Sequence, residues 1–270
     1  MTNLTTPPLL KTATNQQLAK IKAVCFDIDD TITNHGQLGP RSYDALWRLK
    51  EAGFCLVPVT GRPAGWCDLI ARFWPVSAVI GENGAFVFYM TPDGLSRFDL
   101  LPDEERKRNA EQLLELRHKI KQHFKDVQWA SDQNYREYDL AVDFCEDVPP
   151  WSNQKLEELM ELCRDAGAIY KLSSIHLNIW YGDYTKRKAV ESWLFTGAAG
   201  APFTPPSPDQ WIYAGDSPND VPAFELFGLS VGVANIAPYL KTIECHPTWV
   251  TNGEGGDGFT ELADALLAAK

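Results

Sequence analysis

A short acidic segment that directly follows an apolar run is the feature that most constrains this chain. Residues 21–26 are largely apolar, and residues 27–31 read DIDDT, which places three carboxylates within four positions. A short apolar run bounded by polar residues predicts a buried strand, so the carboxylates would lie at its carboxyl end, the edge at which open α/β sheets bind ligands. Gathered carboxylates repel one another, and their oxygen atoms suit Mg²⁺. The alternative is a solvated acidic turn after a strand.

A second acidic cluster ends another apolar run near the C-terminus. Residues 211–214 read WIYA and are followed by GDSPND at 215–220, which contains Asp216 and Asp220. If both runs are strands of one parallel sheet, their carboxyl ends meet at the same edge. Asp27 and Asp216 can then share one metal ion. The two clusters together therefore predict a metal site more specifically than either alone.

Three further residues are candidates for binding phosphate at this edge. Thr60 and Gly61 follow the apolar run 54–59, where they offer a hydroxyl and an unobstructed backbone N–H. Lys186 opens a predicted helix, and a lysine and a helix N-terminus both attract phosphate.

The rhythm of the elements predicts two domains. Apolar runs alternate with helical patterns near both ends of the chain, which is typical of a parallel sheet. Between them, a predicted hairpin, a long polar helix and further strands form an α+β unit. We therefore expect a Rossmann-like α/β core at 19–85 and 183–270, an inserted α+β domain at 86–182 and a loose tail at 1–18.

Charge and composition exclude several classes of partner. The formal net charge of −11 argues against nonspecific nucleic-acid binding and against anionic membranes. No segment approaches the roughly 18 apolar residues of a membrane span, and residues 1–17 lack the pattern of a signal peptide. The six cysteines form no CxxC pair, which favours reduced thiols. We expect a cytoplasmic protein.

Four motifs in order resemble the haloacid dehalogenase-like (HAD) phosphatase superfamily. They are DIDDT at 27–31, TGR at 60–62, Lys186 and GDSPND at 215–220. The likeness covers about residues 20–85 and 183–265, and the segment between them is similar to the type-2 caps of that superfamily. The turn GENGA at 81–85 resembles the branch with the smaller α/β cap, type 2B or Cof-like, which includes sugar-phosphate phosphatases. The resemblance thus implies a HAD core with an inserted cap.

The resemblance also implies a role for each site residue. Asp27 would be the nucleophile that forms an aspartyl-phosphate, and Asp29 the general acid and then the base that activates water. Thr60, Gly61 and Lys186 would hold the phosphoryl oxygens. Mg²⁺ would be bound by the Asp27 carboxylate, the Asp29 backbone carbonyl and Asp216, with support from Asp220.

Asp29 decides the expected reaction. Relatives that keep an aspartyl-phosphate without fast hydrolysis, such as the P-type ATPases, carry Thr at this position, so Asp29 favours hydrolysis. We expect Mg²⁺-dependent hydrolysis of a small phosphate monoester, a sugar phosphate or a related metabolite. The alternatives are a phosphomutase of the same superfamily and a non-catalytic switch that binds Mg²⁺ and phosphate.

Several assignments stay open at this stage. The third motif usually reads Lys-Gly-x-Ala and here reads KRKA at 186–189, so Lys188 rivals Lys186 as the phosphate lysine. The candidates for substrate contacts could equally be surface ion-pair or solvent-facing residues: Arg62, Arg136, His176 and Asn178. The sequence does not identify the ester, the pathway or the oligomeric state.

Overall fold

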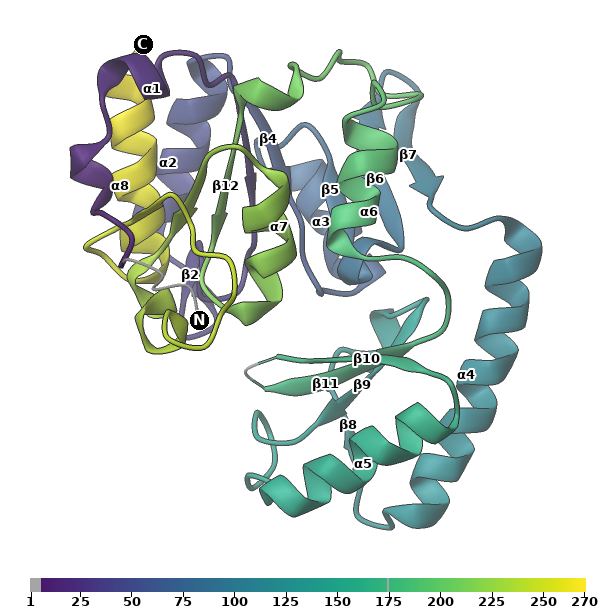
Figure 1. The fold of residues 1–270 in the computed structure, drawn as a ribbon. Coiled ribbons are helices and arrows are strands. Elements are labelled where there is room, and N and C mark those ends of the chain that lie inside the picture. The colour runs from purple at the N-terminus through teal and green to yellow at the C-terminus, as the bar shows by residue number, and fades with distance from the viewer. Residues whose placement is uncertain (1–5, 174) are drawn as a thin grey trace.

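The centre of the molecule is a parallel β-sheet. The computed structural model describes residues 6–173 and 175–270. Five strands pair in the order β14-β13-β12-β1-β4, and all neighbours run parallel (Figure 1). They are β1 (Ala23–Phe26), β4 (Cys55–Pro58), β12 (Trp211–Gly215), β13 (Ser230–Gly232) and β14 (Trp249–Val250). The predicted Rossmann-like parallel core is confirmed.

Helices cover both faces of this sheet, so its strands are buried throughout. In β1, Val24 and Phe26 belong to one hydrophobic cluster and Ala23 and Cys25 to another, because successive side chains point to opposite faces. The first cluster packs on α2 (Pro40–Glu51), α3 (Ala64–Phe73) and α8 (Gly255–Ala268). The second packs on α7 (Val221–Leu226) and on α6 (Lys186–Ala189), which continues as a π-helical turn, Val190–Leu194.

The N-terminal segment is folded, which differs from the loose tail expected for residues 1–18. Leu9 pairs with Val250 at the edge of the sheet, and Leu10 and Leu18 are buried in the first hydrophobic cluster. A Thr14 capping box starts the short helix α1 (Asn15–Leu18). The polar composition of this segment conceals two leucines that the core holds. Residues 1–5 lie outside the described residues.

A small antiparallel sheet adjoins the parallel one. It contains β5 (Val79–Gly81), β6 (Phe86–Thr91) and β7 (Gly94–Asp99), and Ile80 pairs with Val59 just after β4. Phe86 and Val87 contribute to the two clusters of the core. The domain limits at 86 and 182 stay a prediction, and this packing favours counting the hairpin with the larger unit.

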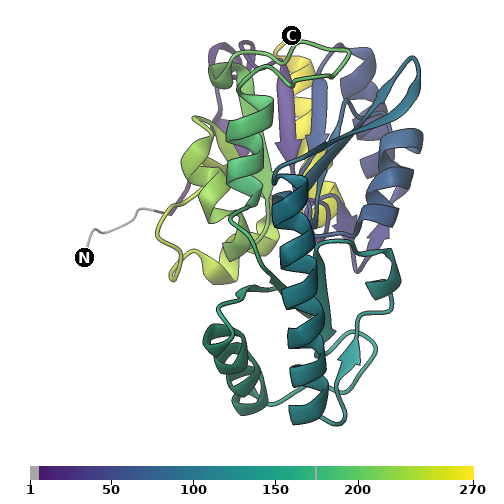
Figure 2. The same ribbon diagram turned by 90° about the vertical axis from the view of Figure 1, so that its right-hand side faces the viewer.

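The second unit is a four-stranded antiparallel sheet with helices on one face (Figure 2). Leu177 and Ile179 pack on these helices, so His176 and Asn178, which alternate with them, point to the other face. That face is turned toward the larger unit (Figure 1). In spatial order the strands are β10 (Ile169–Leu172), β11 (His176–Trp180), β9 (Asp139–Asp143) and β8 (Gln128–Trp129), and the helices are α4 (Asp103–His123) and α5 (Asn153–Asp165).

The polar helix α4 carries its charges as the sequence predicts. Its first turn contains Asp103, Glu104 and Glu105, and its last turn contains Lys121 and His123, which complements the helix dipole.

In the part of the chain that the structure describes, no helix combines the length and the apolar character needed to cross a membrane.

A buried carboxylate joins the two units. Glu82 follows β5 in the left-handed conformation, with φ of 40°, and is fully buried. Its oxygens accept hydrogen bonds from Ala64 N–H at the start of α3 (2.9 Å) and, in the second unit, from Glu137 (3.0 Å) and Tyr138 (2.6 Å). In the sequence, Glu82 is recognisable only as part of the turn motif GENGA at 81–85.

The ionisation of Glu82 is predicted to influence stability. Burial and the neighbouring Asp139 raise the pKa of Glu82 to about 8, although the backbone N–H donors oppose this shift. A carboxyl group whose pKa is raised on folding stabilises the fold fully below its unfolded pKa, and this contribution disappears as the pH rises to about 8.

The test compares the wild type with Glu82→Gln, which resembles the protonated side chain. We expect the Tm advantage of the wild type to shrink between pH 5 and pH 8 in thermal unfolding. The exposed Glu51→Gln serves as control and should show a constant difference. An advantage that grows with pH would mean that the N–H donors keep Glu82 ionised.

Candidate active site

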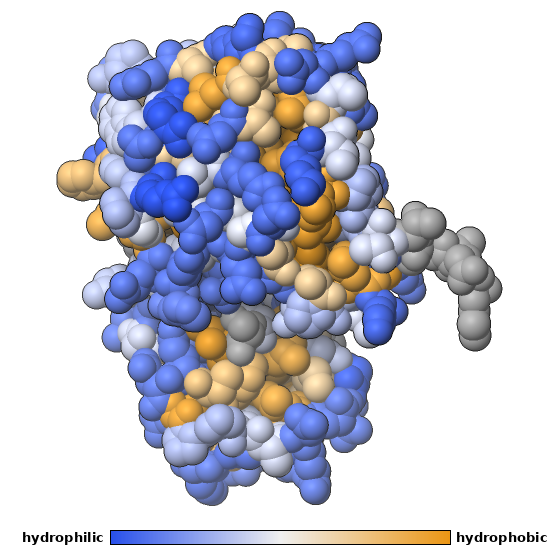
Figure 3. All heavy atoms as spheres, turned by 90° about the vertical axis from the view of Figure 1, so that its left-hand side faces the viewer, coloured by the Kyte–Doolittle hydropathy of each residue, from blue (hydrophilic) through white to orange (hydrophobic). Residues whose placement is uncertain are grey.

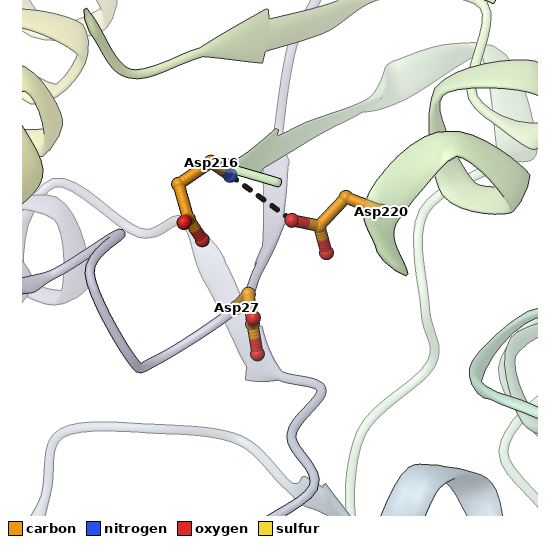
Figure 4. A group of neighbouring side chains, drawn as sticks. All are labelled: Asp27, Asp216 and Asp220. Carbon is orange, nitrogen blue, oxygen red and sulfur yellow. Dashed lines mark hydrogen bonds between the residues drawn. The ribbon is translucent and has the colours of Figure 1, made fainter. Parts of the chain in front are cut away.

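Three aspartates meet at the carboxyl edge of the parallel sheet. Asp27 directly follows β1 and Asp216 directly follows β12, its parallel neighbour. Asp220 ends a short 3-10 turn, Pro218–Asp220. One carboxylate oxygen from each lies within 4.8 Å of the others, and all three residues are buried (Figure 4). The structure thus brings together the two acidic clusters of the sequence.

Hydrogen bonds within the GDSPND segment fix two of these carboxylates. The backbone N–H of Asp216 donates to Asp220 Oδ2 (3.0 Å), and the Tyr213 hydroxyl donates to Asp220 Oδ1 (2.5 Å). The Thr31 hydroxyl donates to Asp216 Oδ1 (3.0 Å). A Cβ on Gly215 would lie 2.5 Å from the Asp220 carboxyl carbon, so this close approach requires glycine.

Lys186 faces the carboxylates, whereas Lys188 does not. Lys186 Nζ lies 2.9 Å from Asp27 Oδ1 and 3.6 Å from Asp220 Oδ1. The Lys188 side chain is 45% exposed and pairs with Asp183. The Thr185 hydroxyl accepts a hydrogen bond from the Lys188 backbone N–H and so caps α6. Of the two rival lysines, the geometry therefore favours Lys186 as the phosphate lysine.

The electrostatics of this cluster favour an added cation. Burial, then Asp220 and Asp27, raise the pKa of Asp216 to about 9. Burial together with Asp220 and Asp29 raises the pKa of Asp27 to about 7, against the effect of Lys186. Burial disfavours the Lys186 ammonium, but Asp27 and Asp220 outweigh it and raise its pKa. One ammonium does not balance three carboxylates.

Thr60, Gly61 and Asn83 lie beside this cluster. The Thr60 side chain is buried and its hydroxyl oxygen accepts a hydrogen bond from Arg62 N–H (3.0 Å). Gly61 and Asn83 line the adjoining cavity. Asn83 Nδ2 is a buried donor that has no hydrogen-bond partner among the described residues. A buried donor without a partner is costly, so an anion bound here would satisfy it.

Asp29 is held by Arg62. The guanidinium of Arg62 donates to both carboxylate oxygens of Asp29, with distances of 3.0 Å from Nε and 2.6 Å from Nη2. Its other side lies over the Trp66 ring, 4.4 Å from the centroid. Arg62 was an open candidate for a substrate contact, and the structure places it on a predicted catalytic carboxylate.

The face of the four-stranded sheet that carries His176 and Asn178, its inner face, lines a cavity of about 780 Å³. The same cavity is lined by Asp27, Asp216 and Lys186 of the larger unit. In the space-filling view, hydrophilic side chains gather on part of the face of the molecule that is shown, where the two units meet (Figure 3). Arg136, His176 and Asn178 all line the cavity, and each has a partner in the second unit: Asp132 at 2.9 Å, Glu146 at 2.8 Å and Asp139 at 2.9 Å. Arg136 also donates to the Gly61 carbonyl (3.1 Å), so it joins the units.

Lys171 is a cavity residue that the sequence analysis missed. It lies on β10, directly opposite Asn178 of β11. The sequence pattern predicts no strand over residues 169–172, so it does not indicate that Lys171 shares the face of Asn178. The alternation of IYKL is too short to predict a strand alone.

Comparison with known proteins gives the family. The sequence model of the haloacid dehalogenase-like hydrolases matches residues 24–139 and 104–256, which is most of the chain. The chain belongs to the haloacid dehalogenase-like hydrolases. The predicted family and enzyme class are confirmed.

Several relatives agree with this chain over nearly their whole length. A phosphoglycolate phosphatase of Archaeoglobus fulgidus is 26% identical over 92% of this chain and 97% of its own, and phosphoglycolate phosphatase 1 of Saccharolobus solfataricus is 25% identical over 92% and 96%. A crystal structure from Thermoplasma acidophilum has a TM-score of 0.73 at 16% identity, covering 92% and 98% of the two chains. A putative HAD/COF-like hydrolase from Plasmodium vivax has a TM-score of 0.68 at 17% identity, covering 95% and 99%.

The contact between Lys186 and Asp27 leads to a prediction about stability. Lys186→Met leaves buried carboxylates without their cation, and breaking a buried pair in this way costs about 3 kcal/mol. Asp27, with a pKa of about 7, is largely neutral below that pH, so the cost should fall in acid.

Thermal unfolding in EDTA checks this expectation. Lys186→Met should lower the Tm more at pH 8 than at pH 5.5, while Lys188→Met should have little effect at either pH. Equal effects of the two variants at pH 8 would contradict the placement of Lys186.

Proposed function

We propose that this enzyme is a Mg²⁺-dependent phosphatase that hydrolyses a small phosphate monoester through an aspartyl-phosphate on Asp27. The observation that carries the proposal is the buried group of Asp27, Asp216 and Asp220 with Lys186, at the sheet edge beneath the cavity. Membership of the hydrolase family supports it.

The residues at the edge fit Mg²⁺. The donors are all oxygen atoms, and the buried carboxylates exceed the single ammonium in charge. We propose Asp27, Asp216 and the backbone carbonyl of Asp29 as ligands. Asp220 would support them, because both its oxygens already accept hydrogen bonds from Tyr213 and Asp216. The bound ion would offset the charge of the carboxylates and the phosphate.

Four groups of this chain are proposed to hold the phosphoryl oxygens. They are the Lys186 ammonium, the Thr60 hydroxyl, the Gly61 N–H and the Asn83 amide. The orphaned Asn83 Nδ2 is the structural observation that supports anion binding here. Donors fixed in advance stabilise the charge that spreads over the phosphoryl group in the transition state.

The two steps of the reaction use different aspartates. Asp27 attacks phosphorus while Asp29 donates a proton to the leaving alkoxide, and Asp29 then takes a proton from the water that hydrolyses the aspartyl-phosphate. Arg62, which contacts both Asp29 oxygens, orients this carboxylate. The second unit would exclude bulk water from the cavity.

The substrate is proposed only by class. The sequence motifs predict a sugar phosphate or a related metabolite. Two relatives are named phosphoglycolate phosphatases, so a phosphorylated acid is a second candidate class. The net charge of −11 disfavours nucleic acids and anionic membranes as partners. A cytoplasmic location also stays a prediction. The alternatives are a phosphomutase and a non-catalytic switch. Asp29 disfavours the switch, because this residue is the proposed general acid and base for hydrolysis.

The test is phosphate release from a panel of sugar phosphates and organic-acid phosphates with Mg²⁺. We expect release by the wild type, its loss in EDTA, and a loss of about 1,000-fold or more in Asp27→Asn, because the nucleophile is removed. No release from any compound, with Mg²⁺ and phosphate still bound, would favour the switch. Dependence on a bisphosphate activator would favour the mutase.

A further inference from the structure

The basic side chains that line the cavity differ in whether they have an acidic partner. Four of them have an acidic partner within 4.0 Å: Arg62 with Asp29, Arg136 with Asp132 and Asp139, His176 with Glu146, and Lys186 with Asp27. No ion pair involves Lys171 in the ranges 6–173 and 175–270. The cavity also contains Asp30 and Glu254, neither of which pairs with it.

Lys171 faces the site from the opposite wall. It pairs in register with Asn178, whose side chain is buried on the inner face of the sheet, and both line the cavity. The flanking β11 residues Leu177 and Ile179 pack on the other face. Burial and the nearby Lys186 lower the pKa of Lys171, while Asp220 acts in the opposite direction. The two lysines are therefore close enough to repel each other.

An unpaired, half-buried ammonium beside a cavity is unfavourable until an anion binds. Asp220 offsets only part of its desolvation, so a ligand that brings a negative charge would stabilise this ammonium further. The phosphoryl group of the proposed substrate occupies the Lys186 side. Lys171, on the second unit, is left for the other end of the substrate.

We propose that Lys171 is a specificity residue that binds an anionic group, a carboxylate or a second phosphate, on the leaving group. This inference rests on the proposed phosphatase function and deepens it. The preferred substrate is then a short phosphate monoester with a second negative charge, such as a phosphorylated hydroxy acid, rather than a neutral sugar phosphate. A neutral leaving group would leave the ammonium without a partner.

Three two-carbon esters test the inference: 2-phosphoglycolate, 2-hydroxyethyl phosphate and ethane-1,2-diyl bisphosphate. 2-Hydroxyethyl phosphate has a neutral leaving group, whereas the other two carry a second negative charge. The wild type should have a higher kcat/KM for at least one of these two than for 2-hydroxyethyl phosphate, and the ratio of the two kcat/KM values measures the preference. Lys171→Met should lower that ratio about 10- to 100-fold, the range of a hydrogen bond to a charged group, mainly through KM. The ester whose kcat/KM falls most in Lys171→Met shows whether Lys171 binds the carboxylate or the second phosphate. Lys171→Arg should restore much of the ratio.

A matched control separates this role from a general effect of charge. Lys119→Met removes an exposed lysine of α4, on the far side of the sheet, and should leave the ratio unchanged. Equal losses of Lys171→Met on all three esters, or no preference for an anionic ester in the wild type, would overturn the inference while the phosphatase function stands.

Binding separates the inference from the proposed function. In the Asp27→Asn background, calorimetry with 2-phosphoglycolate and with the bisphosphate should show weaker binding when Lys171→Met is added. Such weakening supports Lys171 even if the wild type hydrolyses nothing, in which case only the phosphatase function fails. Unchanged affinity for both compounds would overturn the inference.

Discussion

The repulsion among three buried carboxylates is the constraint on which the site depends. Asp27 is distant in the chain from Asp216 and Asp220, and the parallel pairing of β1 with β12 brings the three to one edge. Lys186 reaches them from α6, which follows the second unit in the chain. Part of the negative charge is left over, and it suits the cation of the proposed reaction, which would in turn attract the phosphoryl group.

The second unit depends on contacts that also belong to the active site. Glu82 accepts hydrogen bonds from both units, and Arg136 joins Asp132 and Asp139 to the Gly61 carbonyl. These contacts are buried and charged, so they are strong only while their geometry is kept. The loop that contains Gly61, a proposed phosphate donor, therefore also contacts the second unit, which carries Lys171.

The parts of the fold that the sequence predicted have strong local signals. The apolar runs of β1, β4 and β12 are continuous because helices cover both faces, and each ends in a polar motif. The parts that it missed depend on contacts between distant segments. Lys171 acquires its position from the pairing of β10 with β11, and Glu82 from N–H groups more than fifty residues away. The tail was misjudged because its polar residues conceal Leu10 and Leu18.

The covalent role of Asp27 is the central claim, and detection of a phosphorylated Asp27 peptide in a quenched single turnover tests it directly. With enzyme in excess over an aryl phosphate in ¹⁸O-water, Asp27 attacks phosphorus and releases the aryl alcohol. Water then attacks phosphorus of the aspartyl-phosphate, so the Asp27 carboxylate is restored with its own oxygen atoms. Under strict single-turnover conditions, the released phosphate should therefore carry one solvent oxygen and Asp27 none, whereas prolonged turnover should label Asp27 only if its acyl carbon is attacked. The quenched reaction should also contain an Asp27 peptide heavier by one phosphoryl group. Phosphate release with no phosphorylated Asp27 at any quench time, in the wild type and in Asp29→Asn alike, would contradict the account.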